Sequence, residues 1–140
     1  MIFTHEFKTS ILPEYVDLYG HVNNAQYLQI LEAARWDWIE KFGGTRDLVQ
    51  NLGVGPIVLE INIQFLKELK AKEEIVIKSK REFKLGRLFT QEQEIINSLG
   101  ELACKAVFKM GFLNLQTRRL VEPPFEWREI LEERSVAKNL

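Results

Sequence analysis

The chain has 140 residues, of which 46% are hydrophobic and 28% are charged. This size suits one domain with a substantial core, so we predict a single domain over residues 1–140. The 19 Lys and Arg residues nearly balance the 20 Asp and Glu residues, which argues against a general nucleic-acid binder. The N-terminus lacks a signal-peptide pattern, and no stretch has the apolar length of a membrane span. We therefore expect a cytoplasmic protein that binds neither nucleic acid nor membrane.

The first part of the chain predicts a strand and a loop that lead into a helix. Residues 2–12 have an extended pattern that ends at Pro13, and a loop follows over 13–22. Asn23 has the side chain of a helix N-cap, and Gln26, three residues later, has the spacing of a capping box. A helix is therefore expected to begin directly after Asn23.

The predicted helix runs from about Asn24 to Phe42 and ends at Gly43-Gly44. Its apolar face contains one charged residue, Arg35. A buried arginine needs a partner, and Glu32 has the helical spacing to provide one. The alternatives for Arg35 are a structural ion pair, a subunit interface or a bound phosphate. The apolar surface is wide enough for part of it to face another subunit, through Ile30, Trp36 and Ile39.

The rest of the chain predicts a short helical turn over 45–51 and then a meander of strands. Alternation from Ile57 to Phe65 predicts a strand with one buried face. Residues 74–84 and 87–97 predict a hairpin around Leu85-Gly86. A last strand alternates cleanly, and its core face is formed by Leu102, Cys104, Ala106, Phe108, Met110 and Phe112.

A short amphipathic helix is expected after Pro123-Pro124, ending near Arg134. One long helix followed by antiparallel strands predicts an α+β fold, because the helix is the only element long enough to cover the apolar face of the sheet. We expect a curved antiparallel sheet of about five strands that wraps around the helix.

A carboxylate lies close in sequence to the start of the long helix. Asp17 precedes the helix by one short loop, in which Gly20 permits a tight turn. The first N–H groups of the helix, around Asn23 and Asn24, lack helical acceptors and suit an oxygen that gains negative charge. If that oxygen belongs to the carbonyl group of a substrate, a carboxylate at this place can reach the carbonyl carbon or a water beside it. On spacing alone, however, a cap or turn role for Asp17 is the stronger interpretation.

One segment resembles the signature of the 4-hydroxybenzoyl-CoA thioesterase family, namely Val16-Asp17-Leu18-Tyr19-Gly20-His21-Val22-Asn23-Asn24-Ala25-Gln26-Tyr27-Leu28. The signature is an Asp, two variable residues, Gly-His-Val-Asn-Asn and a Tyr three positions on. Similarity continues through Leu31–Arg35, through Ile61–Lys72 and at Pro123-Pro124, so it covers nearly the whole chain. In one departure, Tyr15 replaces the first acid of the Asp-x-Asp that many relatives carry.

The resemblance implies a hotdog fold that forms dimers or dimers of dimers, with active sites at the dimer interface and no metal or organic cofactor. Asp17 matches the catalytic Asp of the family, which acts as nucleophile or general base. The backbone N–H near Asn24, next to Asn23, matches the donor to the thioester carbonyl. Some hotdog lineages use a helix Glu instead, which makes Glu32 a reserve candidate.

Several other residues are assigned supporting roles. Gly20 and Tyr27 belong to the signature, and His21 is expected to order the loop through a backbone hydrogen bond. Glu60 is a candidate for a substrate contact at the rim of the site, with a solvated strand residue as the alternative. Lys84 and Arg87 are candidates for binding the phosphates of CoA, with a solvated turn as the alternative. The turn lysines Lys67, Lys70 and Lys72 are further candidates for the phosphates of CoA. Cys104 is expected to be an inert core residue, and with two histidines it forms no recognisable metal motif.

The leading prediction is an acyl-CoA thioesterase, a thioester hydrolase that releases a free acid and CoA. One alternative is a thioesterase that acts on acyl carrier protein with the same residues. The other is a non-catalytic hotdog module that binds acyl-CoA. The apolar side chains suit a fatty chain or an aromatic ring, so the acyl group stays open.

Overall fold

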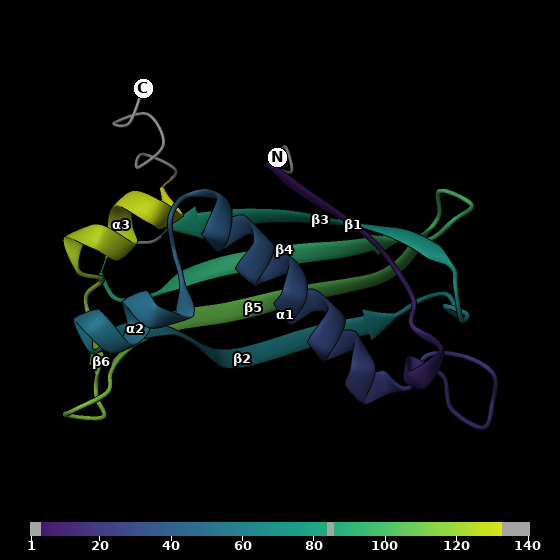
Figure 1. The fold of residues 1–140 in the computed structure, drawn as a ribbon, viewed down its shortest axis with the longest axis horizontal. Helices are drawn as coiled ribbons and strands as arrows, with labels where there is room; N and C mark the ends of the chain where they lie inside the picture. The colour runs from purple at the N-terminus through teal and green to yellow at the C-terminus, as the bar shows by residue number, and fades with distance from the viewer. Residues whose placement is uncertain (1–3, 84–85, 133–140) are drawn as a thin grey trace. The chain divides into compact units, whose positions relative to one another are not determined.

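The computed structural model describes residues 4–83 and 86–132. Figure 1 shows the elements in chain order, from the purple N-terminal strand to the yellow C-terminal helix. They are β1 (His5–Ser10), the short 3-10 helix η1 (Pro13–Tyr15), α1 (Asn24–Lys41), α2 (Arg46–Leu52), β2 (Val54–Phe65), β3 (Glu74–Phe83), β4 (Phe89–Ile96), β5 (Leu102–Asn114), β6 (Leu120–Val121) and α3 (Phe125–Leu131).

The strands form one sheet in the order β1-β3-β4-β5-β2, and β6 pairs with β5. β1 runs antiparallel to β3, with His5 opposite Ser79 and Ser10 opposite Glu74. The predicted α+β class is confirmed. The predicted meander is confirmed only for β3, β4 and β5, because β2 pairs with β5 and not with its chain neighbour β3. β6 was not predicted, because two residues are too few to produce an alternating pattern. The order leaves β1 and β2 as the two edge strands of the main path.

The chain divides into two compact units. The first contains the residues up to 35, 62–80 and 92–107, and the second contains 36–61, 81–91 and the residues from 108 on. The prediction that residues 1–140 form one domain stays a prediction. Across the described parts of the chain, no helix has both the length and the apolarity of a membrane span.

Helix α1 begins where the N-cap predicts. The side-chain oxygen Oδ1 of Asn23 accepts a hydrogen bond from the N–H of Ala25 at 2.9 Å. The reciprocal half of the predicted capping box is wrong, because the N–H of Asn23 donates to the carbonyl of Tyr15 at 3.1 Å. Oε1 of Gln26 is instead buried and has no hydrogen-bond partner among the described residues. Tertiary contact with η1 therefore replaces the local capping interaction.

Arg35 is buried in the first unit and bonds to the sheet. Its Nη1 donates to Oε1 of Gln93 on β4 at 3.0 Å. Nε2 of Gln93 in turn donates to the carbonyl of Leu31 and to Oγ of Ser79, both at 3.1 Å. Burial lowers the pKa of Arg35 to about 10, and the charge of Glu32 opposes this shift. The sequence identified Glu32 as a charge that acts on Arg35 but missed Gln93, which is 58 residues away.

In the second unit, helices and strands bury a group of large aromatic side chains. Trp38, Phe89, Phe112 and Trp127 are each at most 2% exposed. Nε1 of Trp127 donates to the carbonyl of Val54 at 2.7 Å, which ties α3 to the start of β2. The expected end of α3 near Arg134 lies outside the described residues.

Two expectations about apolar surface need correction. Ile30 and Ile39 are only 5% and 6% exposed, so they do not supply the expected subunit-facing surface. The predicted buried face of 57–65 is wrong, because Leu59, Ile61 and Phe65 are 42%, 39% and 50% exposed. Alternation identifies two faces of a strand, but it does not tell whether anything in the same chain covers the apolar one.

Candidate active site

The loop between η1 and α1 closes on itself. Val16 and Val22 form an isolated antiparallel bridge, and the N–H of Asp17 donates to the carbonyl of His21 at 3.1 Å. The N–H of Gly20 donates to the carbonyl of Asp17, also at 3.1 Å. Gly20 has φ of 83°, a left-handed conformation that its missing side chain permits. The predicted tight turn is therefore confirmed, and it fixes Asp17 relative to His21.

The carboxylate of Asp17 orders the turn. Its Oδ1 accepts the N–H of Tyr19 at 2.9 Å, which is an Asx-turn. The side chain of Asp17 is half-buried, whereas Leu18 and Tyr19 at the tip of the loop are strongly exposed. Asp17 thus has the turn role that its spacing predicted, and it uses one of its two carboxylate oxygens, Oδ1, for this hydrogen bond.

His21 and Asn23 hold the other end of the loop. Nδ1 of His21 lies 3.2 Å from the carbonyl of Val22, which accepts when Nδ1 carries the proton. The N–H of Val22 donates to the carbonyl of Leu69 at 2.9 Å, so the loop is joined to the turn after β2. Asn23 and Ala25 form the cap described above, which leaves the N–H of Asn24 without an acceptor among the described residues. The helix therefore presents an unsatisfied donor at this point.

A pocket of about 240 Å³ opens beside this helix N-terminus. It is lined by His21, Val22, Asn24, Tyr27, Phe65, Leu66, Lys67 and Glu68. Two segments far apart in sequence thus form it: the signature segment, and the end of β2 with the turn that follows. Asp17 is not among these residues, although its loop partner His21 is.

Tyr27 and Phe65 form the aromatic part of the pocket. Their rings meet edge to face, with centroids 4.9 Å apart. Tyr27 is 4% exposed and Phe65 is 50% exposed, so one ring belongs to the core and the other to the surface. Burial raises the pKa of the Tyr27 phenol to about 12, with smaller contributions from Cys104, Glu68 and Glu73. The phenol is therefore protonated at neutral pH.

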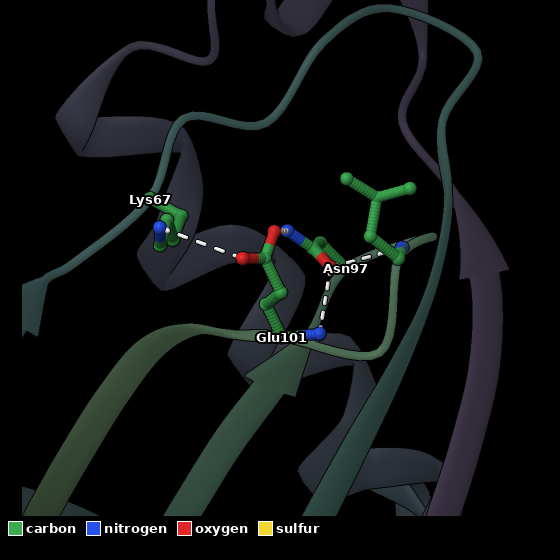
Figure 2. Close-up of polar contacts among 4 residues, drawn as sticks. Lys67, Asn97 and Glu101 are labelled. Atoms are coloured by element: carbon green, nitrogen blue, oxygen red, sulfur yellow. Dashed lines mark hydrogen bonds and ion pairs between the residues drawn. The ribbon is translucent and has the colours of Figure 1, made fainter.

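The rim of the pocket is anchored to the start of β5. The N–H groups of Leu66 and Lys67 both donate to the carbonyl of Ala103, at 2.9 and 3.1 Å. Nζ of Lys67 pairs with Oε2 of Glu101 at 3.5 Å, and Nδ2 of Asn97 donates to Oε1 of Glu101 at 3.2 Å (Figure 2). The Asn97 hydrogen bond, and after it the Lys67 charge, hold the pKa of Glu101 below its usual value.

The sequence matches the model of the thioesterase-like superfamily over residues 11–133. The chain belongs to this superfamily. It is 28% identical over 120 residues to the long-chain acyl-CoA thioesterase FadM of Escherichia coli, covering 85% of this chain and 90% of FadM. It is also 28% identical over 76 residues to the chloroplastic acyl-acyl carrier protein thioesterase ATL3 of Arabidopsis thaliana, covering 54% of this chain and 40% of ATL3.

Solved structures confirm the predicted hotdog fold. The Staphylococcus aureus protein SAV2348, solved in complex with CoA, superposes with a TM-score of 0.85 at 18% identity, covering 97% of this chain and 87% of that one. The prediction that the chain is a thioester hydrolase is confirmed at the level of the superfamily.

The structure brings only some of the predicted site residues of this thioesterase together. Asn24, His21, Tyr27 and Lys67 line the pocket. The other described candidates are absent from its lining, and they are Asp17, Gly20, Asn23, Glu32, Glu60, Lys70, Lys72 and Arg87. Glu60 pairs with Lys109 at 3.1 Å and is strongly exposed, as expected of a solvated strand residue. Lys84 lies outside the described residues.

Sequence reasoning missed Phe65, Leu66 and Glu68 as pocket residues of the thioesterase. Long-range hydrogen bonds, from Val22 to Leu69 and from Leu66 to Ala103, hold this segment, and no local pattern signals them. Cys104 is buried, so its predicted place in the core is confirmed, and burial raises the pKa of its thiol to about 12. Among the residues that the structure describes, no three His, Cys, Asp or Glu side chains form a metal-binding group.

Proposed function

We propose that this thioesterase hydrolyses acyl-CoA, with Asp17 as nucleophile or general base and the N–H groups around Asn24 as oxyanion donors. The observation that carries the proposal is the pocket at the start of α1, where Asn24 and the Asp17 loop meet. The match to FadM over most of both chains and the CoA complex of SAV2348 support acyl-CoA as the substrate class.

The chemistry requires a negative charge on the thioester oxygen. As a base, Asp17 takes a proton from a water whose oxygen attacks the carbonyl carbon; the C–S bond then breaks, and CoA leaves as the thiolate. As a nucleophile, the Asp17 carboxylate attacks the carbon itself, and the C–S bond breaks as CoA leaves as the thiolate. Water then hydrolyses the resulting mixed anhydride, which releases the free acid and restores the carboxylate. In both routes the oxyanion accepts a hydrogen bond from the unsatisfied N–H of Asn24, at the positive end of the helix dipole.

The proposal includes a second copy of the chain, as a dimer or a dimer of dimers. The pocket of one chain has about 240 Å³, less than the ~300–1,000 Å³ of typical ligand sites. It is therefore too small to enclose an acyl-CoA by itself. Edge strand β2 exposes Leu59 and Ile61, which a partner strand would cover. Asp17 then faces a pocket that the partner completes. A monomer in light scattering at assay concentration would contradict this part.

Substitution of Asp17 by Asn tests the catalytic assignment. Asn also accepts the Tyr19 N–H, so the Asx-turn and the fold are retained. We expect thiol release from acyl-CoA to fall by about 10²–10⁴-fold, the usual contribution of a general base. Asp47→Asn, an exposed change in the first turn of α2, is the matched control and should keep wild-type activity. Near-wild-type activity of Asp17→Asn would refute the assignment.

Acyl carrier protein thioesters are the second candidate substrates, because ATL3 matches over part of the chain. The same residues would act on both. Hydrolysis rates measured on the same acyl group, carried either by CoA or by acyl carrier protein, distinguish the two substrate classes. A clear preference for the carrier protein would make acyl carrier protein, and not CoA, the proposed carrier. Ligand binding without thiol release on either carrier would favour a non-catalytic module.

A further inference from the structure

We propose that Phe65, held edge-on against Tyr27, closes the apolar end of the pocket and sets the length of the acyl group that the enzyme accepts. This inference rests on the proposed function, because it concerns the acyl group of the same thioester. It assigns a specificity role to a residue at the end of an edge strand, outside the signature segment.

The pocket has a polar part and an apolar part. His21, Asn24, Lys67 and Glu68 bring polar groups, and the apolar lining consists of Val22, Tyr27, Phe65 and Leu66. With the thioester carbonyl at the Asn24 N–H, the acyl group extends along the apolar lining. A 150 Å³ cavity is known to hold one benzene molecule, so the part of the site that one chain supplies, about 240 Å³, holds the first carbons of the acyl group.

Phe65 and Leu66 are the parts of this lining that can change without opening the core, and of these two the ring of Phe65 packs against Tyr27. Val22 and Tyr27 are 2% and 4% exposed, and Val22 also ties the loop to Leu69. Phe65 is 50% exposed, and its ring contacts Tyr27 from the surface side. Removing the ring therefore lengthens the pocket and exposes Tyr27, with little effect on the buried residues beneath.

The backbone at Phe65 is held independently of its side chain. The next two residues, Leu66 and Lys67, both donate to the carbonyl of Ala103, and the Lys67 side chain pairs with Glu101. The Asn97 amide holds Glu101 in turn, as Figure 2 shows. A substitution at Phe65 thus changes the size of the side chain at a fixed position, as a length-setting residue requires.

The test is a chain-length profile of kcat/KM over straight-chain acyl-CoA substrates from butanoyl to palmitoyl. For Phe65→Ala we expect the ratio of palmitoyl to butanoyl to rise by at least about tenfold, since a change in pocket size commonly changes discrimination by ~10–200-fold. Phe65→Trp should shift the ratio in the opposite direction. Phe125→Ala removes an equally aromatic, 62% exposed side chain from α3 and should leave the profile unchanged.

Opposite shifts in the two Phe65 variants support the inference. An unchanged profile in either folded variant overturns it, even when activity is normal. Calorimetry with free fatty acids of the same lengths gives a second readout that needs no hydrolysis. A wild-type enzyme that hydrolyses no acyl-CoA would refute the proposed function, whereas a length-dependent affinity that follows residue 65 would still support the role of Phe65.

Discussion

Arg35 of α1 and Gln93 of β4 are joined by a 3.0 Å hydrogen bond between Nη1 and Oε1, inside the first unit. Both side chains are buried, at 9% and 0% exposure. Gln93 also donates to the carbonyl of Leu31, so a single glutamine bonds both the side chain and the backbone of the helix. These bonds fix the position and rotation of α1 relative to β4. They are made at Leu31 and Arg35, which lie seven and eleven residues after the start of the helix at Asn24.

Replacement of Gln93 by Leu should destabilise the protein by about 2 kcal/mol, because a buried charged donor loses this acceptor. The measurement is urea unfolding followed by circular dichroism. Gln50→Leu, an exposed change on α2, should shift the midpoint very little. The double variant Arg35→Met/Gln93→Leu should be less destabilised than the sum of the single variants, because it removes donor and acceptor together. Strict additivity would contradict a coupled pair.

Substitutions at Asn23 should separate helix stability from catalysis. Asn23→Ala removes the cap on the Ala25 N–H and should cost about 1 kcal/mol in thermal or urea unfolding. Asn23→Asp restores the cap but places a negative charge beside the proposed oxyanion site. We expect its stability to be near wild type and its kcat to be lower. Asn23→Ser, a neutral cap, should retain both, and equal kcat values for Asp and Ser would argue against an oxyanion site here.

Glu73 should make the free energy of unfolding depend on pH. Burial raises its pKa, but hydrogen bonds from Ser98 and Lys70 outweigh this and lower the pKa below 4.5. A carboxylate with a lowered folded-state pKa stabilises the protein above its unfolded-state pKa, and the contribution is lost as the pH falls through the folded-state value.

The free-energy difference between wild type and Glu73→Gln should therefore be largest near neutral pH and should shrink below about pH 4.5. Urea unfolding between neutral and acidic pH measures it. Glu74→Gln at the exposed start of β3 is the control. A difference that stays constant down to the lowest accessible pH would contradict the proposed linkage.

Much of the fold was predictable because its signals are local. Asn23 caps α1, the two glycines after the helix mark its end, and the alternation from Leu102 to Phe112 matches a strand whose alternate residues are buried. The same logic failed for 57–65, where the alternation is real but the apolar face of β2 is uncovered. Burial depends on what lies opposite a strand, and β2 is an edge strand.

The sequence by itself determined the helix start, the turn at Gly20, the order of the elements and the superfamily, because each depends on residue type at short spacing or on a motif. Only the tertiary structure decided that Phe65 joins Tyr27, that Gln93 bonds Arg35, and that Asn24 rather than Asp17 lines the pocket of one chain. These contacts join segments far apart in the chain, or depend on which way a loop closes. Pairing across such separations leaves no periodic trace in a single sequence.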